Sequence, residues 1–381
     1  MTAPILATIP FNRAILTGRE LENIQQAVET MHLSGDGPFT RRCHALLEQA
    51  LGAPKVLLTT SCTHALEMSA LLLDIRPGDE VILPSFTFVS TANAFVLRGA
   101  KPVFADIRPD TLNLDETRLE ALITARTRAV VVVHYAGVAC EMDAILAIAR
   151  RHGVAVVEDA AHGLFGCYKG RALGTFGELA TLSFHETKNV TCGEGGALIV
   201  NNESYIQRAE VIREKGTNRS SFFRGQVDKY TWVDVGSSYL PSEILAAFLY
   251  AQLEAGNRIQ ARRRVLWTRY RQELAAWASD RGVGLPVVPD HCEQPFHLFY
   301  LILPSLEQRQ SLIAHLASAQ VTAIFHYQPL HLSEMGRRWG GAPGDCPVTE
   351  RVSDGLLRLP LSMGLTDAEQ ERVIAAVLTA P

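Results

Sequence analysis

The sequence predicts an α/β protein with a large domain built on a mostly parallel, mixed sheet and a smaller α+β domain after it. Short β-branched apolar runs alternate with helical patterns between residues 55 and 200, as in proteins with a parallel sheet. Near residue 250 the alternation of apolar runs and helical patterns ends, and a long charged helical stretch begins. Because 381 residues exceed the roughly 250–300 that one hydrophobic core covers, we expect the large domain at residues 1–250 and the small one at 251–381.

Seven apolar runs in the first part have the length and composition of buried strands. They lie at residues 55–59, 80–83, 102–105, 129–134, 154–158, 180–184 and 197–200. Helical patterns such as 63–73 and 142–151 separate several of them. In such a fold, functional side chains gather at the carboxyl ends of the strands.

The second part begins with a helical stretch at 251–280 and continues with an apolar, strand-like run at 297–303. A helix is expected after Ser305, a strand at 321–327 and a last helix from Thr366. No Pro/Gly-rich linker marks the joint, so we expect the two domains to pack together.

Composition excludes several functional classes. The formal net charge is −4, so the chain has no overall positive potential that would attract nucleic acid or an anionic membrane. No run reaches the ~18 apolar residues of a membrane span, which favours a cytoplasmic protein. The seven cysteines are scattered and never spaced as CxxC, which argues against a disulfide framework and a metal site. Neither GxGxxG after an early strand nor GxxxxGK[ST] occurs.

A turn of small hydroxyl residues follows the first strand, in KVLLTTSCTHALEMSALL. Backbone N–H groups and the positive end of a helix at such a turn suit a phosphate. Ser61 or Thr63 acting only as a helix N-cap is the plainer alternative.

A carboxylate ends another strand in VAVVEDAAH, where Asp159 is followed three residues later by His162. At that place a carboxylate can keep a cofactor's ring nitrogen protonated, which makes the ring an electron sink. A helix cap is the alternative for Asp159.

The most specific pattern is LSFHETKNVTCGEGG, in which Lys188 lies just past a strand and before a glycine-rich turn. Desolvation there would lower the pKa of the lysine and make it a Schiff-base nucleophile, whereas most lysines are simply surface residues. A phosphate-binding turn, a carboxylate and a lysine, each at or just after a strand end, together match a pyridoxal 5'-phosphate (PLP) site. Ser183 could add a hydroxyl to the phosphate and Phe88 could stack on the ring; core filling is the alternative for both.

The chain resembles the DegT/DnrJ/EryC1/StrS sugar aminotransferases, which have the fold of type I PLP-dependent transferases, similar to aspartate aminotransferase. The resemblance covers nearly the whole chain. It rests on GDGPFTRRC (residues 35–43), SCT, PSFTFVSTANAF, VHYAGVACEMD, VEDAAHG, SFHETKN, FHYQPLH (325–331) and RLPL (358–361).

The resemblance implies that Lys188 carries the cofactor, which alternates between PLP and its amine form, PMP. It implies that Asp159 contacts the ring nitrogen and that His162 lies near the ring hydroxyl. Phe88 would stack on the ring, and the phosphate would be bound by Cys62, Thr63 and Ser183. His185 would be a wall of the active site, and His326 of FHYQPLH is a further candidate for substrate binding.

The stretches GDGPFTRRC and IREKGTNRSSFFRGQVDKYTW look closest to family members that aminate dTDP-4-dehydro-6-deoxy-D-glucose with L-glutamate. The product there is dTDP-4-amino-4,6-dideoxy-D-galactose, a precursor of enterobacterial common antigen. Another nucleotide keto-sugar is the alternative substrate. A sugar dehydratase with histidine at the lysine position is disfavoured by Lys188, and a non-catalytic sugar-binding protein is disfavoured by Lys188 together with Asp159.

The resemblance also implies a homodimer in which each subunit completes the other's active site. Many relatives place a partner asparagine against the phosphate, but in GSSYLPSEILAA Ser238 stands at that position. The segment KGTNRSSFFRGQVDKYTW carries four cations for a substrate diphosphate, with Arg224 and Lys229 as the main candidates beside Lys215 and Arg219. A solvated loop or a dimer contact is the alternative for this segment.

Overall fold

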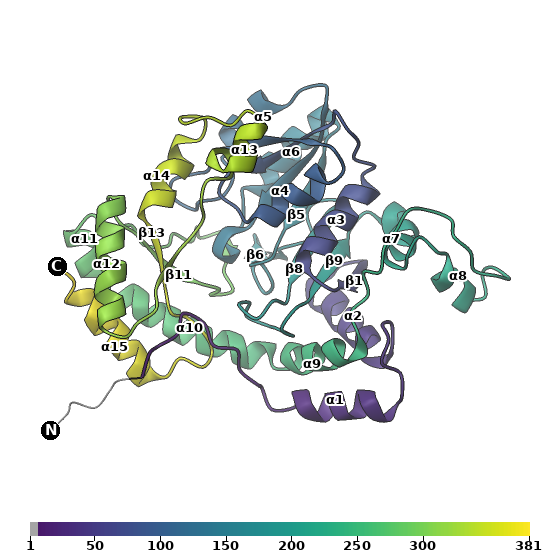
Figure 1. The fold of residues 1–381 in the computed structure, drawn as a ribbon, viewed down its shortest axis with the longest axis horizontal. Helices are drawn as coiled ribbons and strands as arrows, with labels where there is room; N and C mark the ends of the chain where they lie inside the picture. The colour runs from purple at the N-terminus through teal and green to yellow at the C-terminus, as the bar shows by residue number, and fades with distance from the viewer. Residues whose placement is uncertain (1–6) are drawn as a thin grey trace.

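The computed structural model describes residues 7–381, and its larger part is built on a seven-stranded sheet (Figure 1). The strand order is β1-β9-β8-β5-β4-β2-β3. The strands are β1 (Lys55–Thr59), β2 (Glu80–Pro84), β3 (Lys101–Ala105), β4 (Thr127–Val133), β5 (Ala155–Asp159), β8 (Leu179–Ser183) and β9 (Gly196–Val200). Each coincides within two residues with an expected apolar run.

Strand directions confirm the expected mixed, mostly parallel sheet. The neighbours β3, β2, β4, β5 and β8 pair in parallel, whereas β9 is antiparallel to both β8 and β1. Since β1 and β8 are both antiparallel to β9, they run in the same direction. The carboxyl ends of β1, β8, β5, β4 and β2 therefore meet at one edge of the sheet.

Helices cover both faces of this sheet because successive side chains of a strand point to opposite faces. Val131 packs with Leu66 and Phe95 on one face, while Val130 packs with Ile145 on the other. The helices of this part are α1 (Glu20–Glu29), α2 (Pro38–Leu51), α3 (Cys62–Leu72), α4 (Val89–Val96), α5 (Glu116–Leu122), α6 (Met142–His152), α7 (Ile206–Arg213), α8 (Arg219–Phe223) and α9 (Glu243–Glu254). A small sheet of β10 (Cys292–Glu293), β6 (Cys167–Tyr168) and β7 (Arg171–Ala172) lies beside them.

The C-terminal part surrounds an antiparallel sheet with the order β11-β13-β12. Its strands are β11 (Phe299–Ile302), β12 (Ile324–Phe325) and β13 (Leu356–Leu359). Its helices are α10 (Gly256–Glu273), α11 (Ala275–Asp280), α12 (Leu306–Ser318), α13 (Glu334–Arg338), α14 (Pro347–Gly355) and α15 (Asp367–Leu378). The last helix begins as expected, because Thr366 and Glu369 form a reciprocal capping box.

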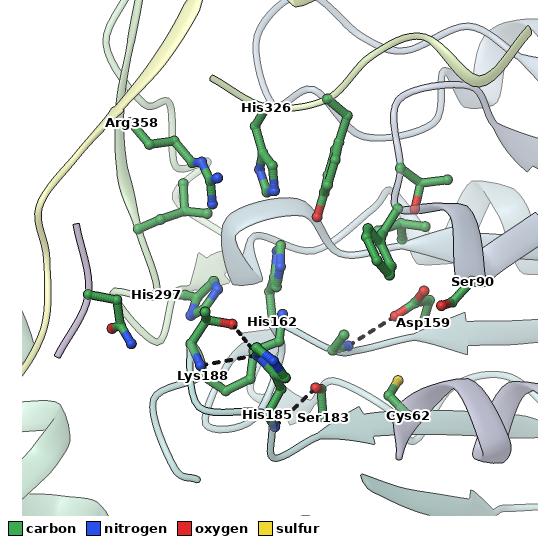
Figure 2. A pocket seen from close by; sticks show the side chains of 18 of the residues that line it. Cys62, Ser90, Asp159, His162, Ser183, His185, Lys188, His297, His326 and Arg358 are labelled. Atoms are coloured by element: carbon green, nitrogen blue, oxygen red, sulfur yellow. Dashed lines mark hydrogen bonds between the residues drawn. The ribbon is translucent and has the colours of Figure 1, made fainter. Parts of the chain in front are cut away.

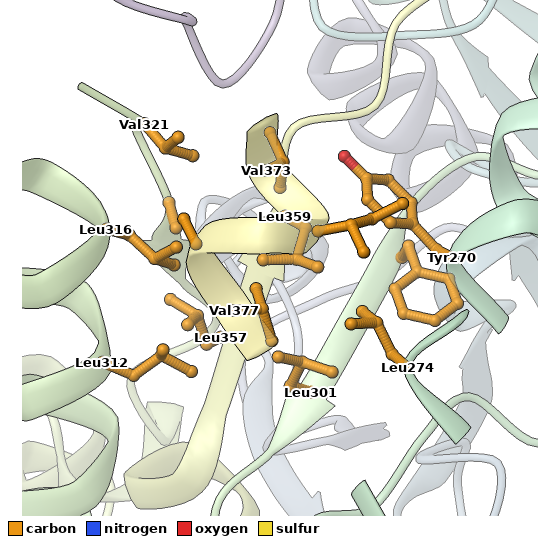
Figure 3. Packing of buried hydrophobic residues seen from close by; sticks show 14 of the residues in the cluster. Tyr270, Leu274, Leu301, Leu312, Leu316, Val321, Leu357, Leu359, Val373 and Val377 are labelled. Atoms are coloured by element: carbon orange, nitrogen blue, oxygen red, sulfur yellow. The ribbon is translucent and has the colours of Figure 1, made fainter. Parts of the chain in front are cut away.

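A separate hydrophobic core holds the C-terminal part together (Figure 3). Leu301, Leu357 and Leu359 of the sheet pack against Leu316 of α12 and Val377 of α15. Ile9, from the other end of the chain, belongs to the same core and forms a bridge with Val321. Within residues 7–381, no helix is both long and apolar enough to cross a membrane.

Candidate active site

A cavity of about 480 Å³ lies at the carboxyl edge of the large sheet, where the C-terminal part closes over it. Its volume is in the range of small-molecule and cofactor sites. Side chains from both parts of the chain point into it (Figure 2). Most predicted site residues line it: Cys62, Thr63, Phe88, Asp159, His162, Ser183, His185, Lys188 and His326.

The start of α3 forms one end of the cavity. The Ser61 hydroxyl caps this helix by accepting the His64 amide at 3.1 Å. The amides of Cys62 and Thr63 find no acceptor within residues 7–381. The hydroxyls of Thr63 and Ser90 lie 2.8 Å apart beside them. Free amides at a helix N-terminus, with hydroxyls around them, form a site for an anion such as phosphate.

Asp159 presents a carboxylate to the middle of the cavity from the end of β5. One oxygen accepts the Thr91 hydroxyl at 2.7 Å and the other accepts the Ala161 amide at 3.2 Å. Burial raises the pKa of Asp159, against these hydrogen bonds and the charge of Lys188, which lower it. A protonated ring nitrogen facing this carboxylate would stabilise its charge.

Lys188 enters the cavity from the turn after β8, where its amide donates to the His185 carbonyl at 2.9 Å. Desolvation lowers the pKa of Lys188 to about 8; the charge of Arg358 acts in the same direction and that of Asp159 opposes it. Near neutral pH a minor fraction of the amine is therefore unprotonated, far larger than in a lysine with the ordinary pKa of 10.5. That fraction can attack a carbonyl carbon.

Three neutral histidines stand around the lysine. Burial lowers the pKa of His162, His297 and His326 well below the usual range, and nearby cations add to the effect. The Ala136 amide donates to Nδ1 of His162 at 3.3 Å, so the proton of this neutral ring is on Nε2. His162 therefore offers a hydrogen-bond donor to the cavity. Its ring centroid lies 4.3 Å from that of His297.

Ser238, Arg224 and Lys229 do not line this cavity. Both guanidinium Nη atoms of Arg224 contact the carboxylate of Glu210, at 3.1 and 2.7 Å. Lys229 and Ser238 are exposed outside the cavity, and Ser238 forms a bridge with Glu214. In a single subunit the loop cations are thus apart from the predicted cofactor site.

The cavity also contains residues that the sequence reasoning did not single out. Arg358 is the only cation of the motif RLPL, so it had a local signal. Thr91, in the motif PSFTFVSTANAF, does not line the cavity but is hydrogen-bonded to Asp159, which does. Phe11 and Asn12 reach the cavity from the N-terminal segment, and His297 lies just before β11. No local pattern at these three positions points to a site.

Comparisons with known proteins identify the family of this chain. A family model described as the DegT/DnrJ/EryC1/StrS aminotransferase family matches residues 15–378. The spore coat polysaccharide biosynthesis protein SpsC of Bacillus subtilis is 33% identical over 382 residues, covering 97% of this chain and 96% of that protein.

Solved structures are similar over the whole fold. The aminotransferase TlmJ from Streptoalloteichus hindustanus has a TM-score of 0.90 at 30% identity, covering 98% of this chain and 99% of that one. The protein Spr1654 from Streptococcus pneumoniae, in its PLP form, has a TM-score of 0.91 at 26% identity, with 98% of both chains covered. With a family match over nearly its full length and relatives this similar, the chain belongs to the DegT/DnrJ/EryC1/StrS aminotransferase family.

Proposed function

We propose that this chain uses PLP to move the amino group of L-glutamate to the C4 ketone of dTDP-4-dehydro-6-deoxy-D-glucose. The products are dTDP-4-amino-4,6-dideoxy-D-galactose and 2-oxoglutarate. The observation that carries the proposal is that Lys188, with its lowered pKa, shares one cavity with the buried carboxylate of Asp159. A nucleophilic lysine and an acid for a ring nitrogen are the two groups that PLP chemistry needs.

The cavity has a suitable group for each polar part of PLP: the phosphate, the ring nitrogen and the ring hydroxyl. The free amides of Cys62 and Thr63 suit the phosphate. A side chain at position 196 would have its Cβ 2.3 Å from the Cys62 nitrogen, so Gly196 lets β9 approach this turn closely. Asp159 suits the ring nitrogen, and Nε2–H of His162 suits the ring hydroxyl.

Asp159 and Lys188 act on two different protons of the reaction. When bound, PLP supplies an electron sink for the carbon that loses its proton. The Asp159 carboxylate keeps a proton on the ring nitrogen. Nζ of Lys188, once free, takes the proton from Cα of the amino donor. In the second half-reaction the same amine delivers a proton to C4 of the sugar.

The choice of sugar rests on resemblance and on relatives. The stretches GDGPFTRRC and IREKGTNRSSFFRGQVDKYTW favour a dTDP-linked 4-keto-6-deoxy sugar. The name of the Bacillus subtilis relative assigns that protein to polysaccharide biosynthesis, in which sugars are used as nucleotide derivatives. A panel of nucleotide keto-sugars, differing in base and keto position, tests this choice directly.

A homodimer with shared active sites is part of the proposal. The segment around α8 extends away from the body of the subunit (Figure 1). It exposes large apolar side chains, among them Phe223 at 70% and Trp232 at 76%. Such clustered exposure is typical of protein interfaces. In a dimer this segment could carry Lys229 towards the partner's cavity.

Replacement and labelling of Lys188 test the proposed function. Lys188→Ala should abolish both half-reactions, because among residues 7–381 no other lysine lines the cavity to bind PLP and to move the proton between cofactor and substrate. Borohydride reduction of the wild-type holoenzyme should fix the mass of the reduced cofactor on the peptide that contains Lys188. Labelling of a different lysine, or a cofactor band that does not respond to glutamate, would refute the proposal.

A further inference from the structure

A buried network of hydrogen bonds joins the large sheet to the C-terminal part beside the cavity. Its members are Ser85, just after β2, His331 in the short helix Leu330–Leu332, and Glu350 on α14. The hydroxyl of Ser85 lies 2.6 Å from Nδ1 of His331, and Nε2 of the same ring lies 3.0 Å from the Glu350 carboxylate. Ser85 and His331 are both 0% exposed, so the bond between them is closed to solvent.

A serine, a histidine and a glutamate in sequence are the residue types of a nucleophilic triad. Here, however, neither Ser85 nor His331 lines the cavity, and a fully buried hydroxyl cannot meet a substrate. The Ser85 hydroxyl also accepts the His331 amide at 3.2 Å, so it is engaged by both the ring and the backbone of the same residue. The network therefore holds parts of the protein in place and does not react.

The network holds together two stretches that form walls of the cavity. The first stretch, residues 85–88, follows β2, and the second, residues 326–331, follows β12. Four of their side chains line the cavity: Thr87, Phe88, His326 and Tyr327. The ring centroids of Phe88 and Tyr327 lie 6.5 Å apart. The bond between Ser85 and His331 therefore helps to set where these two rings stand in the wall.

Other hydrogen bonds fix the same joint between the two parts. The Leu330 amide donates to the Ser85 carbonyl at 3.0 Å. Asp106, just after β3, accepts the amides of Val348 and Thr349 at the start of α14, at 2.9 and 2.8 Å. Because several bonds share the load, removal of one hydroxyl should loosen the wall without unfolding the protein.

We propose that Ser85 and His331 are positioning residues that keep the wall of Phe88 and Tyr327 closed over the amine form of the cofactor. The proposal rests on the proposed aminotransferase function. In that function PLP is bound covalently to Lys188, whereas PMP is retained only by noncovalent contacts. A displaced wall should therefore weaken the binding of PMP far more than that of PLP.

The release of cofactor from the two forms of the holoenzyme tests this difference without turnover. Each form is dialysed, and the cofactor that remains is measured by absorbance. In Ser85→Ala, the Kd of PMP should rise about 10-fold, the effect of losing one buried hydrogen bond, while PLP stays bound. His331→Gln, whose amide replaces the ring Nε2 but not Nδ1, should behave in the same way. The double variant should lose little more than either single variant, because both remove the same bond.

Two further variants separate positioning from a general loss of stability. Ser305→Ala removes a hydroxyl that caps α12 and does not line the cavity. It should lower the melting temperature without changing the Kd of PMP. His331→Asn keeps an amide in the place of the ring Nδ1, so it should recover part of the PMP binding that His331→Gln loses.

A wild-type Kd of PMP in Ser85→Ala would overturn the role of this network. Equal losses of PMP and PLP, or a comparable loss of PMP in Ser305→Ala, would also overturn it, because both describe a general loosening of the fold. A wild-type protein that binds neither PLP nor PMP would instead overturn the proposed function.

Discussion

The hydroxyl of Thr91 donates a 2.7 Å hydrogen bond to the carboxylate of Asp159. The bond joins α4 to the end of β5, and it opposes the effect of burial on the pKa of that carboxyl. It therefore helps to keep Asp159 ionised where the ring nitrogen of PLP is expected.

Asp159→Asn should retain PLP but transaminate slowly. The amide has no negative charge, so it would stabilise a protonated ring nitrogen less than the carboxylate does. We expect a loss of about 10²-fold in the glutamate half-reaction, the effect of one well-placed electrostatic group. Stopped-flow absorbance checks the rate, and the cofactor band checks that PLP is still bound. Near-normal turnover in this variant rules out the role.

Thr91→Val should move the acidic limb of the activity profile to higher pH. Loss of the hydrogen bond removes an influence that lowers the pKa of Asp159, so its pKa rises further. At a given acidic pH a smaller fraction of Asp159 is then ionised, and activity falls earlier as the pH decreases. Thr91→Ser keeps the hydroxyl and should keep the wild-type profile. The same limb in the Val and Ser variants would contradict the prediction.

Loading of PLP onto the cofactor-free protein should depend on pH through Lys188. Only the unprotonated amine attacks the aldehyde, so the rate should rise with pH and reach half its maximum near the Lys188 pKa of about 8. Asp159→Asn removes a charge that raises this pKa, so its midpoint should lie at lower pH. Absorbance at the cofactor band follows the reaction. A midpoint near the ordinary lysine value of 10.5 would show that burial has little effect.

Trp232→Ala should weaken a dimer held by the segment around α8. Trp232 is 76% exposed in the single subunit, and burying an aromatic ring at an interface contributes strongly to association. Sedimentation equilibrium should show more monomer than in wild type. Met335→Ala, on α13, serves as the control because it removes an exposed apolar side chain far from α8 in Figure 1. Equal dissociation constants for all three proteins would exclude this interface.

Arg224→Ala and Lys229→Ala test the loop cations as ligands of the substrate diphosphate. Either change should raise the KM for the nucleotide sugar while the glutamate half-reaction stays unchanged, since glutamate carries no diphosphate. The effect should be larger for Lys229, because Arg224 is already paired with Glu210. Equal losses in both half-reactions would indicate a structural role for the loop.

Most of the large sheet could be predicted from sequence because its strands are continuous apolar runs, such as 129–134, which form Thr127–Val133 in the structure. The expected strand at 321–327 is shorter, Ile324–Phe325, because only these two residues pair with β13. The position of β9 between β1 and β8, antiparallel to both, has no local signal. Strand order depends on long-range pairing, which an apolar run does not encode by itself.

For the candidate site, the sequence by itself determined the chemical groups at the end of β5 and in the turn after β8, and it predicted Asp159 and Lys188 as partners in one PLP site. Only the tertiary structure decided that Arg358 and His297 complete the same cavity, and that Arg224 lies outside it. The physical reason is that strand ends gather neighbouring motifs locally. Arg358 on β13 and His297, just before β11, by contrast reach the cavity only because the C-terminal part, with its own core, lies beside the carboxyl edge of the large sheet.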